Sequence, residues 1–230
     1  YTYNPTFDYD FKNGIVIDRP VTIIGNGHTL NATGLARIFN IQANDVTIKN
    51  ITFTNAKNRE DGGAVYFKNS GTVENCNFTN NTASNGGAVY FFAQGTVTNC
   101  NFTNNSAISE DTGGGALFML SGTVTNCNFT NNTASYDGGA VYFYENGEVT
   151  NCNFTKNNAR SHGGALYFDN GYCKVTSCIF VNNVVEYSGG ALYFYNGGEI
   201  TNCNFTNNQA TGIISWAGAV DMRSGTVTDC

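Results

Sequence analysis

Cysteine is the reactive residue type with the most regular spacing in this 230-residue chain. Eight cysteines in a secreted protein would suggest a framework of four disulfides. Thiols that recur once per structural repeat would instead stack into one inward column of small, buried, apolar side chains. The eighth cysteine, Cys173, lies outside the periodic set, in the turn-like segment "NGYCKVTSC". Seven cysteines recur every 24 to 27 residues: Cys76, Cys100, Cys127, Cys152, Cys178, Cys203 and Cys230.

Both hypotheses for this cysteine column, free ladder and axial disulfides, remain open from the sequence. Neighbouring thiols would lie about 4.8 Å apart, which is within reach of a disulfide, but their parallel Cβ directions would strain its dihedral angle. A metal site is not predicted, because thiols in a single line offer no tetrahedral ligand set. Cys173 is predicted to be the thiol most open to solvent or to a pairing partner.

Carboxylates and histidines are the next candidates for chemistry. Glycoside hydrolysis needs two carboxylates at a set separation, and a calcium-dependent lyase needs acidic ligands beside a basic residue. His28 and His162 are solitary, so we predict no enzyme and no cofactor, with calcium in the variable segments as an open alternative. Several acids lie in one variable segment per repeat and the others are scattered; those in the variable segments are Glu60, Asp61, Glu110, Asp111, Asp137 and Glu186.

A periodic aromatic column is the main candidate for binding. Its residues alternate with inward apolar residues, so they should face outward. We expect an exposed stripe that holds a sugar chain or a partner protein; the alternative is that the rings only stack and stabilise the sheet. Phe92, Tyr144 and Tyr195 lie beside it. The column is Tyr66, Tyr90, Phe118, Tyr142, Tyr167 and Tyr193.

Asn-x-Thr/Ser sequons are dense and suggest glycosylation at the surface. Repeats rich in Asn and Thr also create such triplets by chance. Neighbouring sites one repeat apart could not all carry a bulky glycan. The main candidates are Asn77, Asn101, Asn128, Asn153 and Asn204.

Composition narrows the function classes. The net charge is −6 and no basic patch is present, so nucleic acid is not an expected partner. No apolar run approaches about 18 residues, so no membrane span is predicted in this segment. Charged residues make up only 12% of the chain, and its abundant Asn, Thr, Tyr and Gly are typical of strands and turns.

These residues sit in a repeat with a period of 24 to 28 residues, marked by Gly-Gly-Ala. The tripeptide starts at Gly62, Gly86, Gly114, Gly138, Gly163 and Gly189, with the variant Ala217-Gly218-Ala219. Each repeat holds three short alternating stretches and no helical period. The prediction is an all-β, single-stranded parallel β-helix of about nine coils, each with three short strands. The Leu spacing of a leucine-rich repeat is missing, and a β-sandwich would not need nearly identical consecutive strand triplets.

The alternation also predicts which side chains point inward. In the repeat that begins at Gly62, these are Val65, Phe67, Val73, Cys76 and Phe78. Cys and Phe can both face inward only if the chain bends just before the Cys, and Asn, Ser and Asp accept such bends. Stacked Asn side chains at this bend should form an asparagine ladder. The bend column is Asn75, Asn99, Asn126, Asn151, Ser177, Asn202 and Asp229.

The N-terminal part is a degenerate version of the same repeat. "TIKNITFTN" (Thr47 to Asn55) aligns with "TVTNCNFTN", which puts Ile48 in the inward Val place and Ile51 in the Cys place. We therefore predict one domain over residues 1–230, with a cap and degenerate coils over 1–45 and regular coils over 46–230.

The Gly-Gly-Ala and Phe-x-x-Asn motifs resemble the repeats of chlamydial polymorphic outer-membrane proteins. "VTNCNFTNN" resembles the adhesin-like surface proteins of methanogenic archaea, and "IVIDRPVTIIGNGHTL" is similar to the opening coils of pectin-lyase-like β-helices. The resemblance implies a right-handed β-helix, an extracellular location, and adhesion or envelope assembly.

On this basis the expected function is a cell-surface adhesin-like or stalk segment, with glycans or proteins of a host or neighbouring cell as partners. Because an open solenoid end is an unpaired edge, the alternative is end-to-end self-association into an extracellular filament or sheath. A third hypothesis, which the mostly uncharged outward columns do not favour, is a carbohydrate-active pectin-lyase-like enzyme.

Overall fold

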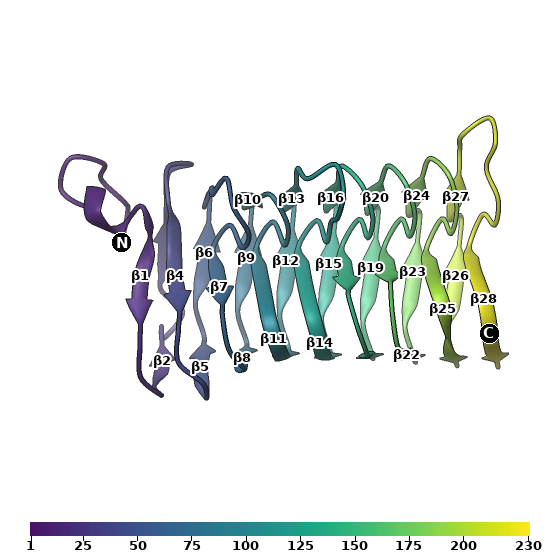
Figure 1. Cartoon of the computed structure of the whole chain (residues 1–230), viewed down its shortest axis with the longest axis horizontal. Coiled ribbons are helices and arrows are strands. Elements are labelled where there is room, and N and C mark those ends of the chain that lie inside the picture. Colours follow the sequence, from purple (N-terminus) through teal and green to yellow (C-terminus); the bar gives the residue numbers. More distant parts are fainter.

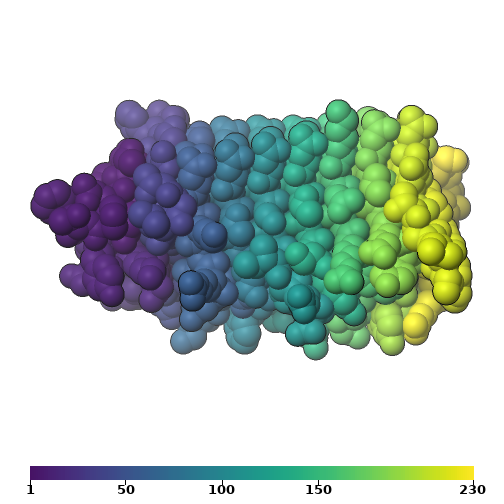
Figure 2. Space-filling view, turned by 90° about the horizontal axis from the view of Figure 1, so that it is seen from above, coloured from purple at the N-terminus to yellow at the C-terminus, as the bar shows by residue number.

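In the computed structural model, which describes residues 1–230, every strand pairs in parallel with the equivalent strand of a neighbouring repeat. Val89 pairs with Val65 on one side and with Leu117 on the other. Figure 1 shows the resulting coils side by side along one axis, and in Figure 2 the sequence advances as bands along the rod. The structure is thus a parallel β-solenoid of about nine coils, as predicted.

Three parallel sheets run the length of the rod. The long sheet contains β1 (Asn13–Ile17), β2 (Thr22–Ile24), β4 (Arg37–Ile41), β5 (Val46–Lys49), β7 (Val65–Phe67), β8 (Gly71–Glu74), β11 (Val89–Thr98), β14 (Leu117–Thr125), β17 (Val141–Phe143), β18 (Gly147–Thr150), β21 (Leu166–Phe168), β22 (Tyr172–Thr176), β25 (Leu192–Thr201) and β28 (Val220–Thr228). The Phe sheet contains β3 (Thr29–Asn31), β6 (Thr52–Thr54), β9 (Asn77–Thr79), β12 (Asn101–Thr103), β15 (Asn128–Thr130), β19 (Asn153–Thr155), β23 (Ile179–Val181) and β26 (Asn204–Thr206). The short sheet contains β10 (Thr82–Ala83), β13 (Ser106–Ala107), β16 (Thr133–Ala134), β20 (Asn158–Ala159), β24 (Val184–Val185) and β27 (Gln209–Ala210).

The division of each coil into strands differs from the expectation in one respect. The first two apolar stretches were expected as separate strands, but they lie in the same sheet and merge into one strand in β11, β14, β25 and β28. The third sheet comes from the two-residue strands that follow Phe-Thr-Asn-Asn. Two residues are too short to show an alternating pattern, so these strands could not be predicted.

Each coil turns at three corners, and each corner has a left-handed backbone. The first is the bend column predicted before each Cys, with φ between 52° and 55°. The second follows the Phe sheet, where Asn80, Asn104 and Asn131 have φ of 54° to 57°. The third is the first Gly of Gly-Gly-Ala. At Gly86 a Cβ atom would lie 2.3 Å from the carbonyl oxygen of Val89, and at Gly87 it would lie 2.2 Å from that of Gly115, which accounts for the doubled glycine.

An asparagine ladder is present, but it does not lie in the bend column where we expected it. The corner amides at Asn75 and Asn202 bond Glu74 and Ser177 instead of stacking as a continuous row. The ladder lies at the Asn of Phe-x-x-Asn, just past the second corner, where the side chain turns inward instead of outward. Its members are Asn81, Asn105, Asn132, Asn157, Asn183 and Asn208.

Every amide within this inner ladder, between its end members Asn81 and Asn208, makes four hydrogen bonds. In Asn105, Oδ1 accepts from the backbone N–H and from Nδ2 of Asn81, each at 3.0 Å. Its Nδ2 donates to the carbonyl of Phe78 and to Oδ1 of Asn132, each at 3.0 Å. A buried amide that makes all four of its bonds does not carry the penalty of an unpaired polar group. The inner ladder therefore ties consecutive coils together along the axis.

The predicted inward residues form one continuous core of 47 buried residues from Tyr3 to Cys203. The stacked Phe rings of the Phe sheet, from Phe53 to Phe205, have centroids 4.8–5.0 Å apart, which gives the spacing of the coils. In the degenerate coils, Ile48 pairs with Val73 and Ile51 is buried, as aligned. A 3₁₀ turn at Tyr9–Phe11 precedes β1. None of the helical segments has the length and apolar character needed to cross a bilayer.

Candidate functional site

The predicted aromatic column faces away from the core, but it is not the exposed stripe that we expected. Tyr90, Phe118, Tyr142 and Tyr167 are only 4–9% exposed and form a cluster separate from the main core. Their rings stack face to face with centroids 4.5–4.9 Å apart. Because each ring covers the faces of its neighbours, only the ring edges remain to meet solvent. The column therefore supports the stacking alternative more directly than a binding stripe.

Burial also changes the acid–base properties of this column. Removal from water raises the pKa of the Tyr90, Tyr142 and Tyr167 phenols well above the ordinary value, with nearby carboxylates adding to the shift. The hydroxyl of Tyr142 donates to Oδ2 of Asp169 at 3.2 Å. Burial raises the pKa of Asp169 as well. These phenols are held in the protonated, hydrogen-bonding form.

The exposed aromatic surface lies two residues further along the chain in each coil, within the long strands β11, β14, β25 and β28 and just past the end of the short strands β7, β17 and β21. This outer row is the residue that follows the inward Phe or Met in each coil: Lys68, Phe92, Leu120, Tyr144, Asp169, Tyr195 and Arg223. Its three rings, Phe92, Tyr144 and Tyr195, are 57%, 43% and 39% exposed. They occupy every second coil, with the smaller, half-buried Leu120 and Asp169 between them. The outer row is our candidate binding surface.

Polar groups accompany the rings of the outer row. Oδ2 of Asp169 accepts from Tyr142, whereas Oδ1 of Asp169 takes part in no hydrogen bond of the structure and stays available as an acceptor. The guanidinium carbon of Arg223 lies 4.0 Å from the ring centre of Tyr195, a cation–π contact that orients this ring. Arg223 thereby covers one face of the Tyr195 ring. Exposed aromatic surface beside a few fixed polar groups can bind sugars, which have both apolar and hydroxylated faces.

A histidine cluster beside the buried column was not predicted. The Nδ1 atom of His162 lies 2.8 Å from Oγ of Ser161 and 3.1 Å from Oδ1 of Asp137. In a Ser-His-Asp triad the two partners contact different ring nitrogens, so that a proton can be relayed through the ring. Here both contact the same nitrogen, so the cluster fixes the ring orientation without building a relay. Ser161 and His162, together with Glu110, Tyr136, Arg160 and Tyr187, line an open hollow of about 430 Å³.

The acids of the variable segments do not assemble into a calcium site. Asp61 accepts from Nδ2 of Asn85 at 2.9 Å, and Glu186 lies 3.7 Å from the guanidinium of Arg160. No three His, Cys, Asp or Glu side chains come together as a ligand set. The loop positions of these acids were predicted, but neighbouring loops differ in length and hold the carboxylates apart.

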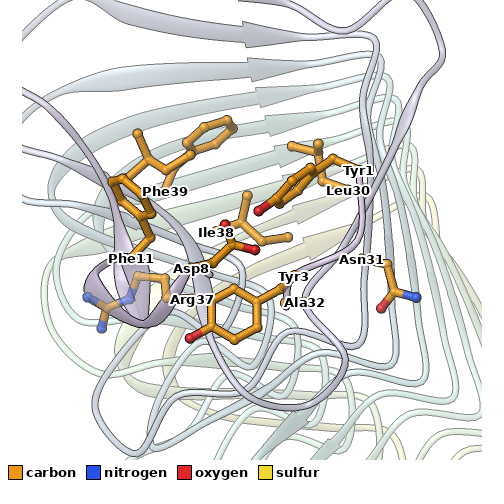
Figure 3. A pocket seen from close by; sticks show the side chains of 11 residues that line it. Tyr1, Tyr3, Asp8, Phe11, Leu30, Asn31, Ala32, Arg37, Ile38 and Phe39 are labelled. Atoms are coloured by element: carbon orange, nitrogen blue, oxygen red, sulfur yellow. The ribbon is translucent and has the colours of Figure 1, made fainter. Parts of the chain in front are cut away.

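A second hollow, of about 260 Å³, lies at the N-terminal end (Figure 3). The rings of Tyr3, Phe11 and Phe39 surround it, and the guanidinium of Arg37 points away from it. Arg37 instead donates to the carbonyls of Asp61 and Gly62, at 2.6 and 3.0 Å. The lining is almost entirely apolar and comes from segments scattered over the first 39 residues. No sequence pattern indicated this hollow.

Comparison with known protein families places the fold. The family model described as "Right handed beta helix region" matches residues 4–135 and again residues 106–227. The chain belongs to this right-handed β-helix family. No curated protein and no solved structure matches it. The likeness to the chlamydial and archaeal surface proteins thus stays a resemblance of motifs.

Within this β-helix the cysteine column is a ladder of free thiols. All eight cysteines are unpaired. The backbone N–H of each column cysteine donates to the sulfur of the next coil, as from Cys76 to Cys100 at 3.4 Å. The sulfurs thus accept hydrogen bonds from the backbone N–H groups of the cysteines that follow the first corner. Cys173, predicted to be exposed, is instead fully buried against the carbonyl of Glu145, because Cys173 is itself an inward residue of β22; the exposed thiol is Cys230.

The predicted sequons lie on the outer face of the β-helix. Asn77, Asn101, Asn128 and Asn153 are exposed and form a second, outer ladder, in which each Nδ2 donates 2.9 Å to Oδ1 of the preceding coil. Ile179 interrupts the column before Asn204. An N-linked glycan on any member would replace one of the two hydrogens on its Nδ2 and leave one N–H, so modification of a site would have to fit beside the ladder bond there.

Proposed function

We propose that this β-helix is a segment of an extracellular, cell-surface protein, adhesin-like or stalk-like, that binds glycan or protein partners and catalyses no reaction. The proposal rests mainly on one observation: the outer row exposes three aromatic rings along one side of the β-helix. Exposed aromatic residues on an otherwise polar surface are typical of binding sites.

The geometry of the polar groups also favours binding over catalysis. The carboxylates are spread over different loops, and the one histidine cluster has both partners on the same nitrogen. The resemblance to adhesin-like surface proteins adds the extracellular location to the proposal. The same surface could not serve a nucleic acid well, because the net charge of −6 repels phosphates.

A binding assay against a glycan array and whole cells would test the proposal. We expect wild-type protein to bind, and the triple variant Phe92→Ala/Tyr144→Ala/Tyr195→Ala to lose most of that binding. The matched control is Tyr172→Ala/Tyr187→Ala, which removes two exposed rings outside the outer row. Equal binding by the triple variant and wild type would dismiss the outer row.

Two further readouts separate the alternative functions. Electron microscopy of the protein should show discrete rods; fibres that grow with concentration would favour the filament or sheath instead. Incubation with the glycans that bind should release no new reducing or unsaturated ends. Product release that depends on His162 or Asp137 would overturn the non-enzymatic assignment.

A further inference from the structure

We infer that the outer row binds an extended β-1,4-linked glycan whose chain runs along the rod axis, with one disaccharide repeat for every two coils. The inference rests on the proposed function and names the ligand class for its binding surface. The observation that carries it is the periodicity of the outer row, in which only every second coil contributes a ring.

The period follows from the coil spacing. Stacked Phe rings of consecutive coils have centroids 4.8–5.0 Å apart. Phe92, Tyr144 and Tyr195 therefore recur every two coils, or about 10 Å. This is close to the length of one disaccharide in an extended chain of equatorially linked pyranoses, in which alternate sugars present the same face. Glycans with axial linkages coil and do not keep one face in line.

The side chains between the rings fit the same arrangement. Leu120 and Asp169 are half-buried and have smaller side chains than the rings on either side, so they can face the sugar that does not stack. Oδ1 of Asp169 is free to accept from a sugar hydroxyl between Tyr144 and Tyr195. Lys68 and Arg223 lie at the two ends of the row and can donate to hydroxyl or acidic groups of the chain.

Phe92 and Tyr195 lie at register shifts of β11 and β25, and Tyr144 directly follows β17, so the neighbouring buried residues and the bonds between coils hold these rings. Each outer-row residue directly follows a buried inward residue, as Phe92 follows Phe91 and Tyr144 follows Phe143. The backbone N–H of Tyr144 donates to the carbonyl of Met119 at 2.9 Å, which fixes its coil on the coil before it. A preorganised row binds without a large ordering cost. Length and linkage of the glycan, rather than its side groups, should then decide affinity.

Titration calorimetry with defined oligosaccharides tests the inference. The probes are β-1,4-linked chito- and cello-oligosaccharides of two to six sugars, with α-1,4-linked maltohexaose and a β-1,3-linked hexasaccharide as comparisons. Contact with all three rings needs about five sugars, so affinity should rise from two to five sugars and then level off. Loss of the central ring in Tyr144→Ala should weaken pentasaccharide binding about tenfold. Tyr172→Ala should leave it unchanged.

Each outcome supports or overturns the inference. Preference for β-1,4 chains with the predicted length dependence supports it. Equal or tighter binding of the α-1,4 or β-1,3 chains, still lost in Tyr144→Ala, overturns it while the proposed binding function stands. If the protein binds cells or proteins but none of these glycans, the inference is overturned and the proposed binding function stands. Binding of nothing in either assay removes both the inference and the proposed function.

Discussion

Substitution of one inner-ladder asparagine should cost far more stability than substitution of an outer-ladder asparagine in the same coil. Asn132 and Asn128 both bond the coils before and after them through their side-chain amides. Asn132 is 0% exposed, whereas Asn128 is open to water. Because φ is positive at Asn131 and not at Asn132, alanine at position 132 introduces no backbone strain.

The magnitude follows from the groups that lose their partner. Oδ1 of Asn132 accepts from the backbone N–H and from Nδ2 of Asn105, each at 3.0 Å. Asn132→Ala orphans both buried donors, at about 1–3 kcal/mol each, so we expect a loss of about 2–6 kcal/mol in the free energy of unfolding. In Asn128→Ala water replaces the lost partners, and the change should stay within about 0.5 kcal/mol.

Equilibrium unfolding in guanidinium chloride, followed by circular dichroism, would measure the difference. The comparison is valid where both variants show one transition with the m-value of the wild type. Equal stabilities for Asn132→Ala and Asn128→Ala would refute the reasoning, since it would mean that the inner ladder contributes nothing beyond a surface hydrogen bond.

Three other predictions follow from the structure. Gly86→Ala should destabilise the protein by more than about 1 kcal/mol, because the new Cβ would lie 2.3 Å from the Val89 carbonyl oxygen. Gly27→Ala should cost only the strain of its positive φ, because no atom lies within 4 Å of its Cβ. Equal losses of stability in urea unfolding would contradict the steric argument. Burial raises the folded-state pKa of Tyr90, Tyr142 and Tyr167 above the unfolded value of about 10, so the stability they contribute is complete below pH about 10 and declines as the pH rises further. Alkaline unfolding curves should therefore be less steep for Tyr142→Phe, and an unchanged pH dependence would show that this phenol is not protected. A thiol reagent at pH 8 should label Cys230 and leave the other seven thiols of the folded protein unmodified, because those seven are buried. Burial also raises the pKa of Cys100 and Cys173 to about 12, whereas the hydrogen bond to Cys100 lowers the pKa of Cys76, so protection of Cys76 tests burial alone. Rapid labelling of Cys173 would place it outside the core.

The coil architecture could be predicted because the repeat makes each structural role visible as a column. Val65, Val89 and Leu117 share one role, and their pairing follows directly from the period. The bend before each Cys was predictable for the same reason, since Asn, Ser and Asp share the tolerance for positive φ. The pattern predicted the structure at these positions because each column meets a single physical requirement, either burial of an apolar side chain or tolerance of positive φ.

What could not be predicted depends on contacts between columns. The ladder was expected at Asn75, but a corner residue points its side chain outward, and only the residue after the second corner, Asn81, turns its amide into the core. The aromatic column that contains Tyr142 was expected to be exposed. Alternation predicts the direction in which a side chain points but not what covers it, so the burial of these rings could not be predicted. Cys173 appeared to be a turn residue because its coil lacks the usual spacing; in three dimensions it is an inward residue of β22.

A crystal structure of the protein with a β-1,4-linked hexasaccharide would show how the outer row holds its ligand. We expect a sugar chain parallel to the rod axis, with alternate pyranose rings in contact with Phe92, Tyr144 and Tyr195. A chain that crosses the axis, or one that lies in the hollow beside His162 or at the N-terminal end, would contradict it.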